Sequence, residues 1–279
     1  MVMPSLLAPV IWQGDLVGRP PRPGDSPLWE LVLCSGDGHW EWRSQQPQAQ
    51  VNGEWLRQQL AAALAIQPRP AALAVFRPQV LGLFQVAAEP LGIPVQPQRR
   101  TPALKARLRQ LAQDWSPAFD PLAVPALPPV PLPESVQGEQ WQFAAVPAAE
   151  LTLVFDHRPI PVLDAPPDLW PVPLGLASTL PIPGVVIQGG RRSRPLAQWL
   201  QAQVPAAIAA IAGDPAGLIL EAGLDRRWVL ATFTDAAVVQ SAQVYQQRLQ
   251  ASQGLHFLMV QPDDSGLTPT GFWLLQQDP

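Results

Sequence analysis

The chain of 279 residues has 47% hydrophobic and only 14% charged residues, with a formal net charge of -4. This length allows two ordinary domains, each with its own core. The negative net charge excludes a protein that coats nucleic acid through its overall field, so any RNA contact must be local. No apolar run is long enough to cross a bilayer, and the first residues lack the basic start of a secretory signal. We therefore expect a cytoplasmic protein without membrane insertion.

The few cysteine and histidine residues leave little basis for metal or nucleophile chemistry. A single cysteine can form neither an internal disulfide nor a CxxC metal site. Cys34 follows an apolar run, which favours a buried small side chain over a nucleophile. His39, His157 and His256 have no metal-ligand spacing, and His256 lies in an apolar segment typical of a hydrogen-bonded core histidine. There is no GxSxG elbow or Walker A loop, so we expect no enzyme activity, catalytic residue, metal or cofactor.

Proline marks the clearest boundary in the chain. It recurs at positions 117, 121, 125, 128, 129, 131 and 133, a density that no regular helix or central strand tolerates. We expect an N-terminal α/β domain over 1–115, a semi-rigid extended linker over 116–136 and a C-terminal α/β domain over 137–279. A proline-rich docking ligand for another protein is the alternative interpretation of the linker.

Hydrophobic spacing and turn residues predict a hairpin, helix and strand order in the first domain. The predicted elements are strands over 28–33 and 39–43 joined by the turn 35–38, a helix capped by Asn52, a strand over 72–76, a helix ending at Gly92, a strand over 93–96, and a helix beginning at Thr101 and Pro102.

The second domain is predicted to repeat this order near its end. The predicted elements are a strand over 140–145, an irregular proline-rich stretch over 156–184, a strand over 184–188, a helix capped by Ser193 or Arg194, strands over 218–221 and 228–233, a helix over 235–252 and a strand over 255–261. The fold class is therefore α/β (α+β), with a small mixed sheet in each domain. A duplicated ββαβ unit is a weaker hypothesis.

Two local groups of basic residues stand out against the acidic composition. The first consists of Arg99, Arg100, Lys105 and Arg109. The second consists of Arg191, Arg192 and Arg194, placed where a strand meets a helix N-terminus. Arginine and the amide groups of such a terminus suit phosphate binding. Solvated charges that flank a helix are the alternative interpretation of both groups.

Tryptophan offers a further route to RNA, because bases stack on aromatic rings. Most of the 11 tryptophans are nevertheless expected in the core, since Trp40 and Trp42 share a sheet face and Trp199 lies on an apolar helix stripe. An enzymatic alternative is a metal-dependent nuclease, because Asp37 and Glu41 lie on a hairpin with Arg43 nearby.

Short segments along nearly the whole chain resemble the Tab/Atab family, the RNA-binding translation factors of chloroplasts and cyanobacteria associated with photosystem I. The matching segments include Val51-Asn52, Gly92-Ile93-Pro94-Val95, Arg99-Arg100-Thr101, Ile182-Pro183-Gly184, Pro195-Leu196-Ala197, Arg227-Trp228, Gly254-Leu255-His256-Phe257-Leu258 and Gly271-Phe272-Trp273-Leu274-Leu275. The segment from Trp12 to Pro20 departs from the usual opening of the family.

The resemblance implies a cyanobacterial RNA-binding protein that promotes translation of photosystem messages. Its expected partner is a single-stranded mRNA leader, with the ribosome or translation factors as further partners. The matched Arg227 joins the two basic groups as a candidate RNA contact. A protein-interaction scaffold in photosystem biogenesis is the alternative function.

Overall fold

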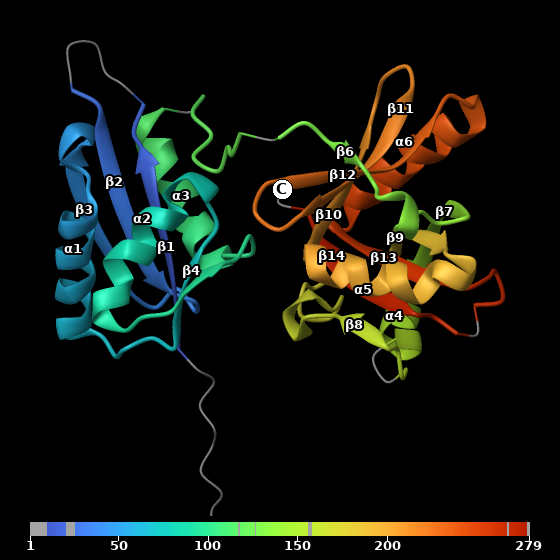
Figure 1. Ribbon diagram of the computed structural model, residues 1–279, viewed down its shortest axis with the longest axis horizontal. Helices are drawn as coiled ribbons and strands as arrows, with labels where there is room; N and C mark the ends of the chain where they lie inside the picture. Colours follow the sequence, from blue (N-terminus) through green and yellow to red (C-terminus); the bar gives the residue numbers. More distant parts are fainter. Residues whose placement is uncertain are drawn as a thin grey trace, which may run out of the picture. The chain divides into compact units, whose positions relative to one another are not determined.

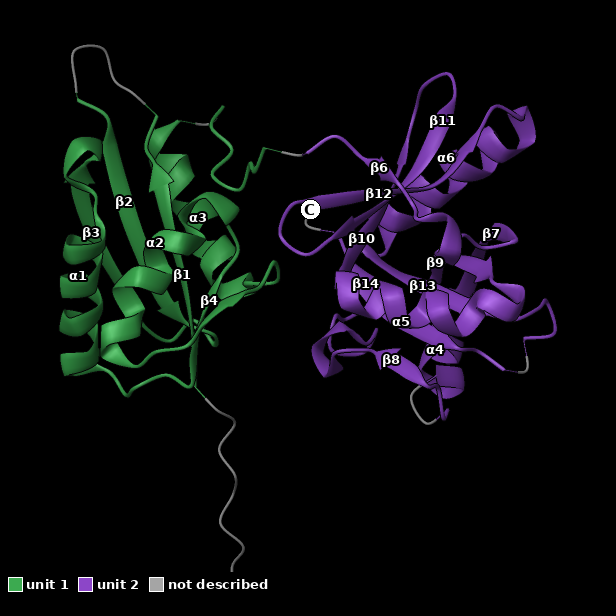
Figure 2. Ribbon diagram, in the orientation of Figure 1, with its two compact units in different colours: residues 1–125 green, residues 126–279 purple. Residues whose placement is uncertain are grey.

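The computed structural model describes residues 10–20, 26–116, 118–125, 127–155, 158–266 and 268–277. The chain divides into two compact units, residues 1–125 and 126–279 (Figure 2). Both contain mixed sheets and helices, which confirms the α/β fold class. The division falls inside the predicted linker. Among the described residues, none of the helices is both long and apolar enough to cross a membrane.

Unit 1 contains a five-stranded sheet in the order β3-β2-β1-β4-β5 (Figure 1). Its elements are β1 Ile11–Gly18, β2 Leu28–Ser35, β3 Glu41–Pro47, α1 Gly53–Ile66, β4 Ala72–Val75, α2 Pro78–Ala88, β5 Val95–Pro97 and α3 Pro102–Trp115. Strands β1, β2 and β3 are antiparallel neighbours, whereas β4 and β5 continue the sheet parallel to β1. The predicted hairpin is confirmed as β2 and β3, and the central strand β1 was absent from the predicted elements.

The sheet of unit 1 has an apolar core on each face. Strand β1 contributes to both cores, because successive side chains on a strand point to opposite faces. Trp12 and Leu16 belong to the apolar core formed with α1 and α2. Val17 belongs to the core formed with α3 on the other face. Gln13 and Asp15 share that second face, and both are buried. The layer beneath α3 therefore encloses polar side chains at the centre of the sheet.

The caps of the unit 1 helices show which predictions depended on local sequence. Asn52 accepts a hydrogen bond from the Trp55 amide at 2.9 Å, which confirms the predicted start of α1. Thr101 is buried but makes no side-chain cap. Instead, Oε1 of Gln13 accepts a hydrogen bond from the Leu104 amide at 3.0 Å. The first turn of α3 is thus capped from a strand 91 residues earlier, which local sequence could not reveal.

Cys34 lies on β2, in the core beneath α3, and is fully buried. Burial raises the pKa of its thiol to about 12, so the thiol stays protonated and unreactive at neutral pH. The prediction of a buried cysteine is confirmed.

A buried ion pair connects β1 to the chain after β4. The Arg77 guanidinium donates to Asp15, with Nε at 3.1 Å from both carboxylate oxygens and Nη2 at 3.0 Å from Oδ2. Asp15 is fully buried, and burial raises the pKa of its carboxyl while Arg77 opposes that shift. The same guanidinium donates to the carbonyls of Pro121 at 2.7 Å and Ala123 at 2.9 Å. One arginine therefore satisfies a buried charge and binds the proline-rich segment.

The residues predicted as a semi-rigid extended linker are mostly parts of the two units. Phe119, Leu122 and Val124 pack against the α3 core of unit 1. Farther along, β6 Val130–Pro131 pairs with a strand of unit 2, where Val136 enters the core. The expectation of a proline-rich docking ligand is not supported, because backbone carbonyls and apolar side chains here are already engaged.

Unit 2 contains two sheets where the sequence predicted one. Their strand orders are β7-β9-β13-β14-β8 and β10-β11-β12-β6. The elements are β7 Gln140–Pro147, α4 Ala148–Phe155, β8 Val162–Asp164, β9 Pro181–Gln188, α5 Ser193–Gln203, β10 Pro205–Ile211, β11 Ala216–Ala222, β12 Arg226–Phe233, α6 Ala236–Ala251, β13 Leu255–Gln261 and β14 Gly271–Gln276. Helix α4 and strands β6, β8, β10 and β14 were not predicted. Strand β8 lies inside the stretch over 156–184 that was predicted to be irregular, so that prediction was wrong in part. The hypothesis of a duplicated ββαβ unit fails, because β13 lies in a different sheet from β11 and β12.

Side chains from α6 and β13 bind the edge strand β10. Nε2 of His256 accepts a hydrogen bond from the Ile208 amide at 2.8 Å, and the Tyr245 hydroxyl donates to the Ile208 carbonyl at 3.2 Å. Nδ1 of His256 lies 2.8 Å from the Gly254 carbonyl. Because a carbonyl only accepts, the proton of the neutral ring must be on Nδ1. The predicted core role of His256 is confirmed.

Replacing Arg77 with alanine should lower the free energy of unfolding by about 3 to 5 kcal/mol, because it leaves a buried carboxylate without its partner. Urea denaturation followed by tryptophan fluorescence measures the loss. Arg57→Ala is the matched control, since Arg57 pairs with the exposed Glu54 on the surface of α1, and its loss should be far smaller. Equal losses in the two variants would contradict a special role for the buried pair.

Stability should fall on acidification because of His256. Burial lowers the pKa of its ring to about 4, so below the ordinary value of 6.5 the unfolded chain binds a proton that the folded chain excludes. The contribution is complete above pH 6.5 and is lost as the pH falls towards 4, by about 3 kcal/mol in total. Unfolding measured from pH 8 to 4 in the wild type and His256→Gln should show a flatter slope in the variant. Parallel curves would contradict this assignment.

Candidate nucleic-acid interface

The first basic group lies around the start of α3 in unit 1. Arg99 and Arg100 are half-buried and lie between β5 and α3. Arg109 is also half-buried and lies within α3. Arg109 lines a shallow cavity of about 310 Å³ together with Phe119 and Asp120 of the proline-rich segment. These three arginines have interaction partners within the structure. They remain candidate RNA contacts, and an RNA would compete there with partners that these side chains already have in the protein.

Lys105 does not lie on a solvated flank of α3, as its spacing in the sequence had suggested. Its side chain is 4% exposed, and the ammonium lies 5.2 Å from the centre of the Phe76 ring. Arg77 approaches the same ring at 5.1 Å. The face of an aromatic ring attracts cations, and this contact draws Lys105 inward. The expectation of an exposed Lys105 was therefore wrong, and we remove it from the proposed RNA contacts.

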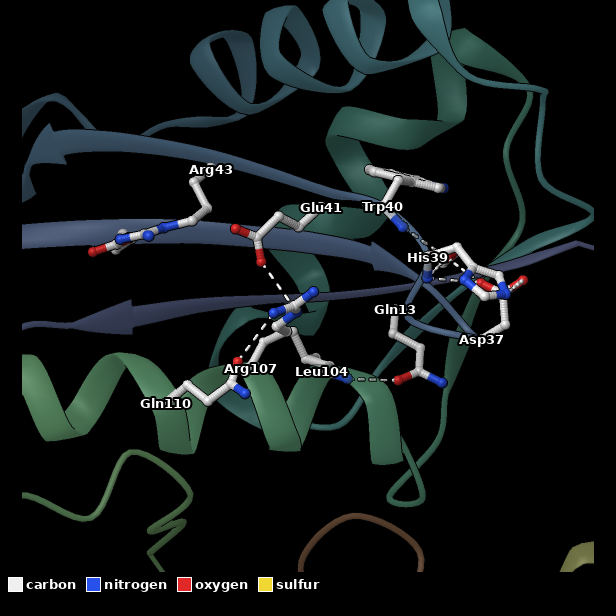
Figure 3. Close-up of polar contacts among 11 residues, drawn as sticks. Gln13, Asp37, His39, Trp40, Glu41, Arg43, Leu104, Arg107 and Gln110 are labelled. Carbon is white, nitrogen blue, oxygen red and sulfur yellow. Dashed lines mark hydrogen bonds and ion pairs between the residues drawn. The ribbon is translucent and has the colours of Figure 1, made fainter.

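The other charged face of α3 is neutralised by β3. Nε of Arg107 lies 3.2 Å from a carboxylate oxygen of Glu41, and Arg107 also donates to the Gln110 side chain at 3.0 Å. Figure 3 shows these contacts beside the Gln13 cap of the helix. Positive charge on this side of α3 is thus balanced by a strand that packs against it.

The acidic pair behind the nuclease hypothesis does not come together. Glu41 points towards Arg107, whereas Asp37 accepts hydrogen bonds from the Ser35 hydroxyl and, at 3.1 Å, from the His39 amide (Figure 3). The Ser35 hydroxyl, followed by the His39 amide, holds the pKa of Asp37 below its ordinary value. Among the described residues, no three His, Cys, Asp or Glu side chains gather where they could hold a metal ion. The geometry gives the nuclease hypothesis no support.

The second basic group forms the entrance to α5 in unit 2. Strand β9 ends at Gln188, and a tight turn at Gly189 leads into the helix. A Cβ on Gly189 would lie 2.5 Å from Cα of Ser193, so only glycine fits the turn. Arg191, Arg192 and Arg194 are all exposed. The sequence therefore correctly placed this group between a strand and a helix N-terminus.

The three arginines at this entrance differ in the hydrogen bonds and ion pairs that their side chains form. Arg192 donates to the Glu134 carbonyl at 2.9 Å. Within the described ranges, the side chains of Arg191 and Arg194 form no hydrogen bond or ion pair. The Glu139 carboxylate lies beside Gly190, where an added Cβ would be 2.0 Å from it, yet it forms no ion pair with the described arginines. Two guanidinium groups at a helix N-terminus are thus available to an anion.

Two tryptophans, one on α5 and one on β12, lie on the elements that carry Arg194 and Arg227. Trp199 on α5 meets Trp228 on β12 edge to face, with ring centres 4.9 Å apart, and both rings are half-buried. Arg227, beside Trp228, is half-buried, and its Nη1 donates to the Leu127 carbonyl at 3.4 Å. Near the end of α5, Arg226 donates to Gln203 at 3.2 Å. The aromatic pair therefore brings α5, which begins at the second basic group, into contact with β12, which carries Arg226 and Arg227.

We call this region the α5–β12 surface and define it by Arg191, Arg192, Arg194, Trp199 and Trp228. Arg227 precedes Trp228 on β12, so its side chain starts from the opposite face of that sheet. The sequence indicated its arginines but not its aromatic pair, because Trp199 and Trp228 come together only across the contact between helix and strand. The buried indole N–H of Trp228 and the Nε of Arg227 have no hydrogen-bond partner within the described part of the chain.

Comparison with known proteins agrees with a nucleic-acid role. The family model described as RNA-binding protein Tab2/Atab2, N terminal, matches residues 11–111, and the model for the C-terminal domain matches residues 119–276. The chloroplastic protein TAB2 homolog of Zea mays is 30% identical over 278 residues, which cover 95% of this chain and 70% of the relative. The Arabidopsis thaliana homolog is 28% identical over 95% of this chain and 74% of its own.

A solved structure of the HTLV-2 integrase catalytic core domain also matches, with a TM-score of 0.29 and 18% identity over 41% of this chain and 78% of that chain. A likeness at this TM-score carries no argument about fold or function. The two family models, in contrast, cover both units in order and at nearly full length. The chain therefore belongs to the Tab2/Atab2 family of RNA-binding proteins.

Proposed function

We propose that the α5–β12 surface of unit 2 binds single-stranded RNA. The observation that carries this proposal is the half-buried aromatic pair Trp199 and Trp228. Trp199 lies on α5, whose entrance carries Arg191 and Arg194, two exposed arginines without a hydrogen bond or ion pair within the described ranges. Guanidinium groups contact phosphates, while tryptophan faces accept unstacked bases. Single strands expose both groups at once, whereas bases inside a duplex are not available for stacking.

The family description supports RNA as the ligand, and the local geometry explains how an acidic molecule can hold it. Positive charge is concentrated at the entrance of α5, in the exposed side chains of Arg191, Arg192 and Arg194. Arg99, Arg100 and Arg109 of unit 1 are proposed as secondary contacts, because they share their charge with partners inside the protein.

We further propose that the RNA is the leader of messages for photosystem subunits, especially those of photosystem I, and that binding promotes their translation. This assignment rests on membership of the Tab2/Atab2 family and on the resemblance of its segments. Contact with the ribosome or with translation factors belongs to the same proposal. A translation reporter that carries such a leader tests it, with a leader of scrambled sequence as the control.

The scaffold alternative is less well supported. It relied on the acidic surface and on docking by the proline-rich linker, and parts of that segment are bound by Arg77 in unit 1 and by β12 in unit 2. Binding of leader RNA by the purified protein alone distinguishes the two functions, since a scaffold would need a third component.

The purified protein should bind single-stranded leader RNA with an affinity that falls steeply as salt increases. Each phosphate contact releases counterions and contributes a slope of about -0.7 in log affinity against log salt. Changing both Arg191 and Arg194 to glutamine should reduce the magnitude of that slope by about 1.4, whatever the RNA sequence. Filter binding from low to physiological salt measures both values.

Arg57→Gln provides the matched control, because it removes one exposed arginine far from this surface in the sequence and already paired with Glu54. Its slope should equal that of the wild type. An unchanged slope in the Arg191 and Arg194 double variant would remove these arginines from the interface. Salt-independent binding by the wild type would contradict the phosphate-based proposal as a whole.

A further inference from the structure

Strand β7 is an edge strand with an open side. In the five-stranded sheet of unit 2 its one strand neighbour is β9, with which it pairs antiparallel over its whole length, from Gln140 opposite Gln188 to Pro147 opposite Pro181. The eight residues of β7 carry no charged side chain. Proteins usually protect such edges with charges, bulges or a covering element, because an open edge can pair with another chain.

The direction of the free hydrogen-bonding groups follows from β9. The Gly189 amide donates to the Gln261 carbonyl on the β13 side, so odd-numbered residues of β9 direct their amides and carbonyls towards β13 and even-numbered residues towards β7. Pro181 and Pro183, which lack an N–H, belong to the odd set. Antiparallel pairing then joins Gly184 to Ala144 in a hydrogen-bonded pair.

The alternate residues of β7 must therefore point their backbone groups outward. These residues are Trp141, Phe143 and Ala145, and within the described ranges their amides and carbonyls have no hydrogen-bond partner besides water. An added strand forms its hydrogen bonds with donors and acceptors that recur at this spacing of two residues.

A groove runs along this open edge. It has a volume of about 450 Å³ and lies between β7 and one face of α6. The helix residues that line it are Ala237, Gln240, Ser241, Val244, Tyr245 and Arg248. They extend over 12 residues of the helix. On the strand side the lining consists of Phe143, Ala144 and Ala145, so the groove lies beside the outward backbone groups of Phe143 and Ala145, with which a short added strand would pair.

The lining of the groove indicates the chemistry of its occupant. Val244 is 37% exposed and offers apolar contact beside Phe143. Arg248 is the single charged residue that lines the groove, and within the described part of the chain its guanidinium forms no hydrogen bond or ion pair. A carboxylate is the group that such an arginine binds best.

We propose that this groove binds an extended peptide segment of another protein, which adds a strand to β7, places apolar side chains against Val244 and directs an acidic residue to Arg248. A second copy of this chain fits less well, because β7 itself carries no carboxylate for Arg248 and the carboxylate of Glu139, directly before β7, lies beside Gly190. RNA fits less well too, because an apolar groove with a single cation cannot neutralise several phosphates.

The test uses a fluorescent heptapeptide of alternating valine and threonine with a glutamate at each end. The full-length protein should bind it, as measured by fluorescence anisotropy. Replacing the glutamates with lysine should weaken binding about tenfold through the loss of the contact with Arg248. Every second amide of the peptide can be N-methylated in two alternating sets. Methylation of one set should abolish binding and methylation of the other should not, since only one set of peptide amides faces β7.

A matched pair of proline substitutions separates the open edge from the sheet itself. Ala145→Pro removes an outward amide and should abolish peptide binding while thermal unfolding stays close to that of the wild type. Ala144→Pro removes the amide that bonds to Gly184 and should lower the unfolding temperature. If Ala145→Pro does not fold, Val244→Glu serves instead, because it places a negative charge in the exposed groove and should weaken binding about tenfold.

The proposal is overturned if the wild type binds none of the peptides at millimolar concentration, or if Ala145→Pro and Val244→Glu both bind as the wild type does. Displacement of the peptide by leader RNA would also overturn it, as would a dimer that Ala145→Pro dissociates. RNA affinity should be unchanged in both variants. Failure of the peptide site and failure of the RNA proposal are therefore separate results.

Discussion

The ion pair between Asp15 and Arg77 is the contact on which the arrangement of unit 1 depends. A carboxylate on the central strand is buried at a high desolvation cost, and only a guanidinium with all its donors engaged offsets that cost. Arg77 reaches this geometry because β4 is parallel to β1 and ends beside it. Its remaining donors bind the carbonyls of Pro121 and Ala123. A buried charge on the sheet thereby determines where the proline-rich segment lies.

Unit 2 presents two surfaces of different chemistry on different elements. The α5–β12 surface combines exposed arginines with half-buried tryptophans, which suits a polyanion with stacking bases. The groove along β7 and α6 combines unpaired backbone groups with an apolar wall and one arginine, which suits an extended polypeptide. Because the two surfaces share no residue, the proposed RNA site and the proposed peptide site do not compete for the same side chains.

Features set by neighbouring residues could be predicted from the sequence, and features set by distant residues could not. The β2–β3 hairpin, the Asn52 cap and the arginine group before α5 depend on residues within a single turn or helix start. The Gln13 cap, the salt bridge of Arg77 and the contact between Trp199 and Trp228 join positions far apart in the chain. Lys105 was misplaced because helical spacing shows its direction but not the Phe76 ring that it meets. Strand β7 was predicted, but its edge position follows only from the order of the sheet.

The burial of Lys105 has a consequence for the charge of the whole surface. It is the only lysine in the sequence, so every basic side chain that reaches solvent is an arginine or a histidine. Guanidinium groups do not lose their proton in proteins. The positive charge at the entrance of α5 is therefore carried by guanidinium groups alone, and reagents or enzymes that modify side-chain amines meet no accessible lysine on this protein.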